Sequence, residues 1–128
     1  MRRKILLVDD EKGFTAMLKL NLESLGSYDV RVENDSERAL TAALEYQPDL
    51  ILLDIIMPKM EGPDVAIEVK NNTALKNTPI IFLTATVTKN EVDSQGGRIG
   101  GHPFVAKPSN LIVLVSTIEK NLVSLHQS

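Results

Sequence analysis

The chain has 128 residues and a formal net charge of −3, with 14 Lys and Arg residues against 17 Asp and Glu residues. This length suits one domain. The slightly negative net charge gives no sign of the basic surface that binds nucleic acid. The absence of cysteine excludes disulfides, zinc–thiolate centres and thiol nucleophiles. No apolar run is long enough to span a membrane, and the basic N-terminus is followed only by the short apolar run Ile5–Val8. We therefore expect a cytoplasmic domain that neither inserts into a membrane nor binds nucleic acid.

The first part of the chain alternates between two kinds of apolar pattern. Ile5–Val8 is apolar without alternation, which predicts a strand that is covered on both faces of a sheet. Tyr28–Glu33 alternates apolar with polar residues and predicts an edge strand with one wetter face. A helical stripe lies between them and ends at Gly26. Its members are Phe14, Met17, Leu18, Leu22 and Leu25.

The same alternation of strands and helices continues along the chain. Further strands are predicted at Leu50–Leu53, Ile80–Leu83 and Phe104–Ala106. A second helix begins at Asp35 or Ser36, either of which is a suitable cap, and ends before Pro48. A third follows Pro63, and the last follows Ser109 or Asn110. The apolar faces of these helices are Leu40, Ala43 and Leu44; Val65, Ala66 and Val69; and Leu111, Leu114, Val115, Ile118, Leu122 and Leu125. This order predicts a parallel sheet with helices on both faces.

The region before the last strand departs from the pattern. It contains four closely spaced glycines, Gly96, Gly97, Gly100 and Gly101. Each glycine inside a helix costs about 1 kcal/mol relative to alanine. We therefore expect at most a short helix near Lys89–Gln95, followed by a glycine-rich loop. Pro103 is compatible with a final strand at the edge of the sheet.

Polar residues follow the predicted strands where ligands bind in a doubly wound sheet. They are Asp9, Asp10 and Glu11 after the first strand, Asp54 after the third, Thr84 after the fourth and Lys107 after the fifth. Taken singly, such residues have ordinary structural roles as helix caps, turn residues or partly exposed lysines. Together they bring carboxylates close to one another, which costs repulsion and desolvation unless positive charge joins them.

Carboxylate oxygens at such a site favour Mg²⁺. We expect Asp10 and Asp54 to bind the ion, with Asp9 acting directly or through a water molecule. The remaining oxygen of Asp54 is then a nucleophile for a phosphoryl group. Lys107 and Thr84 are placed to share the charge on the transferred oxygens. This set of residues therefore predicts phosphoryl transfer to Asp54.

These motifs resemble those of receiver domains of two-component response regulators, in particular the single-domain, CheY-like kind. The resemblance spans essentially the whole chain. It rests on Asp9-Asp10-Glu11, Asp54-Ile55-Ile56-Met57-Pro58-Lys59-Met60-Glu61-Gly62, Thr84-Ala85 and Lys107-Pro108. It implies a flavodoxin-like (βα)5 doubly wound parallel sheet with strand order 2-1-3-4-5, here with a short or irregular fourth helix. Since the chain shows no linker or further domain, we expect one receiver domain over residues 1–128, without an output domain.

The resemblance implies a role for each matching residue. Asp54 is the implied phosphoacceptor, phosphorylated by a histidine kinase or a phosphotransfer protein, and Lys107 the implied phosphoryl contact. The implied ligands of Mg²⁺ are Asp9, Asp10, Asp54 and the backbone carbonyl of Ile56. A cis Lys107–Pro108 bond is also frequent in the family.

A switch between two packings is also implied by the resemblance. Phosphate would draw the hydroxyl of Thr84 inward, and Phe104 would fill the vacated space. A plain core role for Phe104 is the alternative, because buried aromatic rings need no second function. The implied downstream partner is a protein effector that binds the face of the fourth helix, fifth strand and fifth helix. We expect a monomer or a weak dimer.

Two other functions stay open from the sequence. A phosphorylation-independent docking module would keep the receiver fold without using the site. A Mg²⁺-dependent aspartyl phosphatase would share the nucleophile, but such enzymes resemble one another in placing an acid two residues after it, where this chain has Ile56. We therefore expect a signalling domain that accepts phosphate and does not act as a turnover enzyme.

Overall fold

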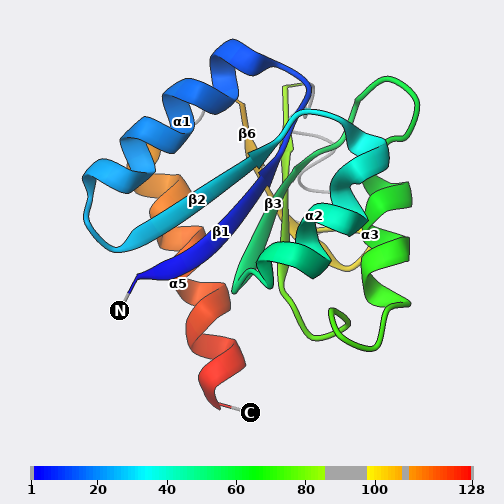
Figure 1. The fold of residues 1–128 in the computed structure, drawn as a ribbon. Helices are drawn as coiled ribbons and strands as arrows, with labels where there is room; N and C mark the ends of the chain where they lie inside the picture. The colour runs from blue at the N-terminus through cyan, green and yellow to red at the C-terminus, as the bar shows by residue number, and fades with distance from the viewer. Residues whose placement is uncertain (1, 86–97, 108–109, 128) are drawn as a thin grey trace.

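A sheet of six strands forms the centre of the fold, in the order β2-β1-β3-β4-β6-β5 (Figure 1). The computed structural model describes residues 2–85, 98–107 and 110–127, so the helix predicted near Lys89–Gln95 lies outside the described residues. The strands are β1 (Arg3–Val8), β2 (Tyr28–Glu33), β3 (Leu50–Asp54), β4 (Ile80–Thr84), β5 (Arg98–Ile99) and β6 (His102–Ala106). The helical elements are α1 (Lys12–Ser24), the 3-10 turn η1 (Ser36–Arg38), α2 (Ala39–Tyr46), α3 (Gly62–Lys70) and α5 (Leu111–Gln127).

The predicted doubly wound parallel sheet is confirmed. β2, β1, β3, β4 and β6 pair in parallel, which is the predicted order 2-1-3-4-5 with β6 as the fifth parallel strand. Helices α1 and α5 lie on one face of the sheet, and α2 and α3 lie on the other (Figure 1). Successive residues of β1 divide between two cores: Ile5 and Leu7 pack with α1 and α5, whereas Leu6 and Val8 pack with α2 and α3.

The predicted helices form, but their buried faces are narrower than the predicted stripes. α1 buries the line of Thr15, Leu18 and Leu22, and leaves Met17 and Leu25 exposed on its flanks. In α2 the side chain of Leu44 is likewise exposed, and the small residues Ala39, Ala42 and Ala43 face the sheet. A helix on an open sheet buries only the arc that faces the strands. No helix within the described parts of the chain is both long and apolar enough to cross a membrane.

Specific residues begin and end the helices. Asp35 caps η1, because its Oδ1 accepts a hydrogen bond from the backbone N–H of Glu37 at 3.0 Å. Asn110 begins α5 in the same way, accepting from the N–H of Ile112 at 2.8 Å. Gly26 follows α1 with φ of 85°, a conformation that glycine adopts without strain. These three predicted helix boundaries therefore have a defined hydrogen-bond or backbone cause.

β6 is the last of the five parallel strands, as predicted, but its first two residues also pair with a sixth, short strand that the sequence did not predict. β5 pairs with β6 in antiparallel fashion, and a two-residue loop of Gly100 and Gly101 joins them. The φ angles of 57° and 85° at these glycines are typical of a type I′ hairpin turn. Pro103 lies opposite Arg98 in the hairpin, and the parallel ladder with β4 begins one residue later, at Phe104. Part of the predicted glycine-rich loop is thus a tight hairpin.

Candidate functional site

A pocket of about 240 Å³ opens at the carboxyl ends of the central strands. The residues that line it are Glu11, Asp54, Ile56, Thr84, Ala85 and Lys107. Asp54 ends β3 and Thr84 ends β4, so the parallel pairing of these strands places both side chains at one edge. Lys107 follows β6, and its backbone N–H donates to the carbonyl of Thr84 at 2.8 Å. Residues that are far apart in the sequence are therefore joined by the sheet itself.

The position of Asp54 depends on the close approach of α3 to the end of β3. The backbone N–H of Gly62, the first residue of α3, donates to the carbonyl of Ile55 at 2.8 Å. A Cβ atom at Gly62 would lie 2.2 Å from the backbone oxygen of Asp54. Only glycine therefore permits this contact without displacing the backbone that carries Asp54.

The ammonium group of Lys107 is surrounded by carboxylates. Its Nζ lies 2.7 Å from Oδ2 of Asp9, 2.7 Å from Oε1 of Glu11 and 3.7 Å from Oδ1 of Asp54. It also lies 4.6 Å from the ring centroid of Phe14, an arrangement that favours a cation. Only 6% of the Lys107 side chain is exposed. Ion pairs and the packing of its buried side chain therefore both fix the position of the lysine.

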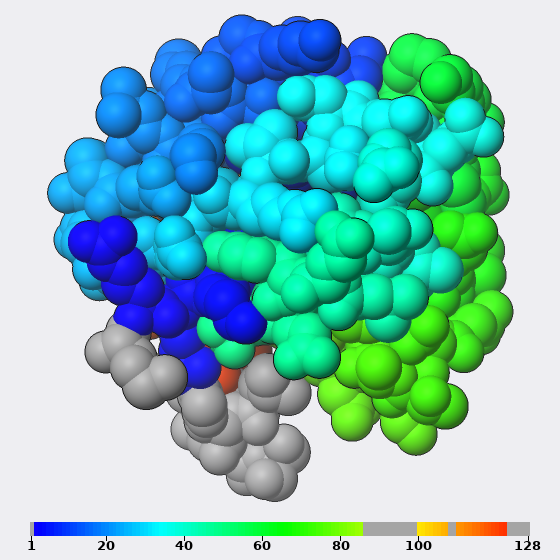
Figure 2. Space-filling view, viewed as in Figure 1, coloured from blue at the N-terminus to red at the C-terminus, as the bar shows by residue number. Residues whose placement is uncertain are grey.

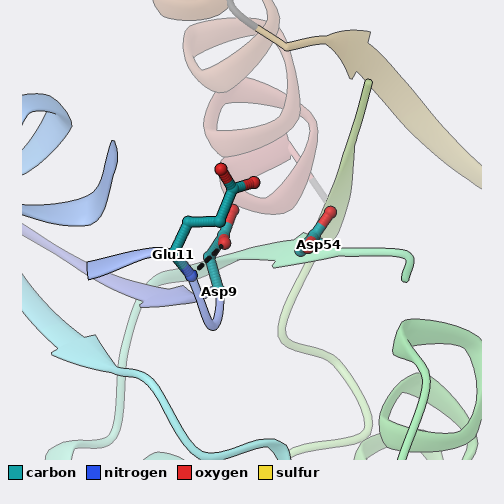
Figure 3. A group of neighbouring side chains, drawn as sticks. All are labelled: Asp9, Glu11 and Asp54. Atoms are coloured by element: carbon teal, nitrogen blue, oxygen red, sulfur yellow. Dashed lines mark hydrogen bonds between the residues drawn. The ribbon is translucent and has the colours of Figure 1, made fainter. Parts of the chain in front are cut away.

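The acidic loop after β1 presents its side chains in different directions. Asp9 is fully buried, and its Oδ1 accepts from the backbone N–H of Glu11 at 2.9 Å (Figure 3). Asp9, Glu11 and Asp54 each offer an oxygen, and these oxygens all lie within 4.8 Å of one another. Asp10 is half-buried and instead lines a neighbouring pocket of about 250 Å³ with Asn34, Asp35, Ser36, Pro58 and Lys59. The structure thus groups Glu11, in place of the predicted Asp10, with the two buried aspartates.

Negative charge dominates the electrostatics of the site. Burial raises the pKa of Asp54 to about 6; the nearby Asp9 carboxylate adds to the rise, and the charge of Lys107 opposes it. Burial lowers the pKa of Lys107, but its hydrogen bonds to Asp9 and Glu11 outweigh burial and hold that pKa above its ordinary value. The lysine is therefore charged at neutral pH, while the Asp54 carboxyl group loses its proton less readily than an ordinary aspartate does.

The donor set fits a hard divalent cation. The three clustered groups are carboxylates, which Mg²⁺ prefers, and three negative charges are set against the single positive charge of Lys107. Asp10 is also near enough to raise the pKa of Asp54 by its charge. The site therefore carries an excess of negative charge that a divalent ion balances.

The other predicted site residues lie at different distances from the pocket. Thr84 is buried and lines it, as does Ile56, whose side chain is exposed. Phe104 is half-buried and packs against the core under α2 and α3. Pro108, and with it the predicted cis bond, lies outside the described residues.

Two contacts of Lys107 had no predicted role at the site, although Glu11 was predicted to lie at this edge of the sheet. Glu11 follows the acidic pair directly, and its place in the same run of acids was the available signal. Phe14 was predicted only as a core residue of the first helix, and its position one turn after Asp10 gave no separate signal. Their contact with Lys107 depends on how α1 leaves β1, which periodicity does not specify.

The fold and the acidic pocket agree with comparisons to known proteins. Residues 5–119 match the response regulator receiver domain family. The chain therefore belongs to the response regulator receiver domain family. Receiver domains are signalling modules rather than turnover enzymes, and they interact with histidine kinases and effector proteins.

Solved structures of receiver domains have similar backbones. The receiver domain of a signal transduction histidine kinase from Syntrophus aciditrophicus is 28% identical, with a TM-score of 0.81 over 98% of this chain and 94% of that one. The chemotaxis protein CheY4 of Vibrio cholerae is also 28% identical, with a TM-score of 0.80 over 94% and 98%. The N-terminal domain of a response regulator receiver protein from Methanoculleus marisnigri JR1 is 31% identical, with a TM-score of 0.70 over 92% and 94%.

Proposed function

We propose that the chain is a phosphoacceptor that receives a phosphoryl group on Asp54 from a histidine kinase or a phosphotransfer protein. One observation carries the proposal: the carboxyl group of Asp54, 8% exposed, lines an open pocket with the Lys107 ammonium 3.7 Å away. A buried carboxylate beside a fixed cation suits a nucleophile whose product bears additional negative charge.

The transfer makes one bond and breaks one. An oxygen of Asp54 attacks the phosphorus atom, and the bond from phosphorus to the donor nitrogen or oxygen breaks. The donor leaves with the bonding electron pair: a histidine donor takes a proton from solvent and is released as neutral imidazole, whereas acetyl phosphate releases acetate. Lys107 is placed to contact one phosphoryl oxygen, and Thr84 lines the same pocket and supplies a hydroxyl. Positioning and charge neutralisation account for most of the catalysis in such transfers.

The proposed cofactor is Mg²⁺, held by Asp9, Asp10, Asp54 and the backbone carbonyl of Ile56. When bound, the ion supplies positive charge that offsets the developing charge on the phosphoryl oxygens. Glu11 is a second candidate ligand, because it shares the carboxylate cluster with Asp9 and Asp54. In either set, Asp9 and Lys107 hold each other in place beside the site.

The proposed output is a change in protein binding. Thr84 and Phe104 belong to neighbouring strands, and Phe104 is only half-buried, so we propose that its ring moves between two positions. The effector surface that we propose includes β6 and α5, where Ile112 and Val113 are exposed. We place this signalling in the cytoplasm, and a monomer or weak dimer is sufficient for it.

Two alternatives use the same fold. A docking module would bind its partner whether or not Asp54 is phosphorylated. An aspartyl phosphatase is disfavoured, because Ile56 occupies the position at which such enzymes place an acid. The test below separates these functions.

The experiment is intact-mass measurement after incubation with Mg²⁺ and acetyl phosphate. We expect a gain of one phosphoryl group, lost in Asp54→Asn and in EDTA, and retained in Asp64→Asn, which removes an exposed carboxylate from α3. No gain in the folded wild-type protein, with either acetyl phosphate or a phosphorylated histidine kinase, contradicts the phosphoacceptor role and favours the docking module. Continuous release of phosphate, without accumulation of the phosphoprotein, favours the phosphatase.

A further inference from the structure

The segment that joins β2 to α2 contacts both loops that carry the proposed metal ligands. In Figure 2 this segment, in cyan, lies between the blue surface of α1 and the green surface after β3. Asn34 belongs to this segment, and its Nδ2 donates to the backbone carbonyl of Asp9 at 2.7 Å and to Oγ1 of Thr15 at 3.1 Å. A single side chain therefore links the segment to the acidic loop and to the first turns of α1.

The backbone of Asp9 is held on one side by the last residue of β2 and on the other by this segment. Its N–H donates to the carbonyl of Glu33 at 3.1 Å, and its carbonyl accepts from Asn34. The first bond holds the peptide group between Val8 and Asp9, and the second holds the peptide group between Asp9 and Asp10. The backbone that carries both acidic side chains is therefore anchored by these bonds.

Ser36 makes the corresponding link to the loop after β3. Its Oγ donates to the backbone carbonyl of Pro58 at 2.9 Å, and the residue is only 4% exposed. Pro58 lies two residues after Ile56, whose carbonyl is a proposed ligand. The ion pairs of Lys59 with Asp35, at 4.0 Å, and with Glu37, at 3.6 Å, cross the same gap but are exposed. Exposed pairs hold a geometry weakly, so the buried hydroxyl is the main link.

We propose that Asn34 and Ser36 are positioning residues that set the spacing between the acidic loop and the loop after β3, and thereby the affinity for Mg²⁺. Mg²⁺ requires near-ideal octahedral geometry, so small displacements of its ligands weaken binding. Residues that orient ligands without touching the ion commonly change metal affinity about 10-fold or more. This inference rests on the proposed function, because it assumes that Mg²⁺ binds between these two loops.

The test is isothermal titration of the full chain with Mg²⁺, with thermal melting to verify that each variant folds. We expect Asn34→Ala and Ser36→Ala each to weaken Mg²⁺ binding by about 10-fold. Ser36→Thr, which keeps the hydroxyl, restores affinity to within about 3-fold of wild type. In the two alanine variants, the concentration of Mg²⁺ that gives half-maximal phosphorylation by acetyl phosphate should also rise about 10-fold. The extent of phosphorylation at saturating Mg²⁺ should be unchanged.

Matched controls remove equivalent side-chain bonds far from the site. Asn121 donates to the carbonyl of Thr117 at 2.8 Å, and Ser24 donates to the carbonyl of Asn21 at 2.8 Å. Asn121→Ala and Ser24→Ala should leave Mg²⁺ affinity unchanged. Unchanged affinity in folded Asn34→Ala, or in both Ser36 variants, overturns the positioning role and leaves the phosphoacceptor role intact. If the wild-type protein does not bind Mg²⁺, the proposed metal site and the positioning role both fail.

Discussion

Lys107 is bound more closely to Asp9 than to Asp54, with Nζ–Oδ distances of 2.7 Å and 3.7 Å respectively. Asp9 is fully buried and Lys107 nearly so, which makes this an ion pair with little access to water. Such a pair is costly to break from one side, because the remaining charge stays buried without its partner. The lysine is therefore a structural partner of Asp9 as well as a proposed contact of the phosphoryl group.

Replacing Lys107 tests the strength of this pair. We expect Lys107→Met to lower the free energy of unfolding by about 3–5 kcal/mol, the usual cost of leaving a buried charge unpaired. Lys12→Met, at an exposed position of α1, should change it by less than about 0.5 kcal/mol. Urea denaturation at pH 7 measures both. The double variant Asp9→Asn, Lys107→Met should cost less than the sum of the single variants; additive costs would show that the two side chains are not coupled.

The raised pKa of Asp54 predicts a dependence of stability on pH. In the folded protein this pKa is about 6, against 3.8 for the unperturbed group, so the folded state binds the proton more tightly. The corresponding stabilisation is full below pH 3.8 and is lost as pH rises through 6. Asp54→Asn removes the buried charge, and at pH 7.5 it should raise the free energy of unfolding by about 2–3 kcal/mol.

The measurement is urea denaturation of the wild-type protein and of Asp54→Asn between pH 3.5 and pH 7.5. Linkage gives the expected difference in free energy of unfolding to an order of magnitude. The difference between the two proteins should shrink toward low pH. A difference that stays constant with pH would mean that Asp54 has an ordinary pKa in the folded protein.

Binding of Mg²⁺ should stabilise the folded state. At a free concentration ten times Kd, linkage predicts a gain of about 1.4 kcal/mol in the free energy of unfolding. EDTA should reverse the gain, and Asp54→Asn and Asp10→Asn should diminish it. Glu68→Gln, which alters an exposed carboxylate on α3, should retain it. A gain of equal size in Asp54→Asn would place the bound ion elsewhere on the molecule.

Two glycines give opposite predictions for substitution by alanine. At Gly62 a Cβ atom would lie 2.2 Å from the backbone oxygen of Asp54, so Gly62→Ala should cost about 3 kcal/mol or more. At Gly13 a Cβ atom would meet nothing within 4 Å, and this glycine lies in the first turn of α1. Gly13→Ala should therefore stabilise the protein by about 0.5 kcal/mol. Denaturation curves distinguish the two, and a well-tolerated Gly62→Ala would contradict the close contact of α3 with β3.

The turn between β5 and β6 supplies a test of backbone conformation alone. A Cβ atom at Gly100 would meet nothing within 4 Å, but φ is 57° there. Gly100→Ala should cost about 1–2 kcal/mol because alanine is strained in the left-handed region. Gly100→Asn should cost less, because asparagine favours this position of a type I′ turn. Thermal melting of the two variants gives the comparison, and equal costs would show that the turn is not type I′.

The sequence predicted the sheet well because buried parallel strands are short, continuous apolar runs. Each predicted strand forms within a few residues of its predicted bounds, and the turn-forming role of Gly26 follows from its position after an apolar stripe. The glycines before β6 were harder to interpret. Glycine lowers helix stability, but Gly100 and Gly101 also suit a two-residue hairpin. The pairing of Arg98–Ile99 with His102 and Pro103 distinguishes the hairpin from a loop.

The site was predictable as a set of residue types at strand ends, because parallel strands carry their last residues to one edge. Which acid of the loop after β1 faces Asp54 was not predictable. Asp10 and Glu11 are adjacent in the sequence, and their directions depend on the backbone bonds that Asp9 makes to Glu33 and Asn34. Asn34 has no periodic signal of its own, so its contact with Asp9 is visible only in three dimensions.

The short strand β5 also affects how the sheet meets other molecules. An open strand edge is a template for unwanted pairing with a second chain, and very short edge strands and charged edges discourage such growth. β5 is two residues long and pairs with the first two residues of β6, His102 and Pro103. At the opposite margin, β2 carries Asp29, Arg31 and Glu33 among its six residues. Each margin therefore carries a feature that discourages edge-to-edge growth: a short hairpin strand at one and charged side chains at the other.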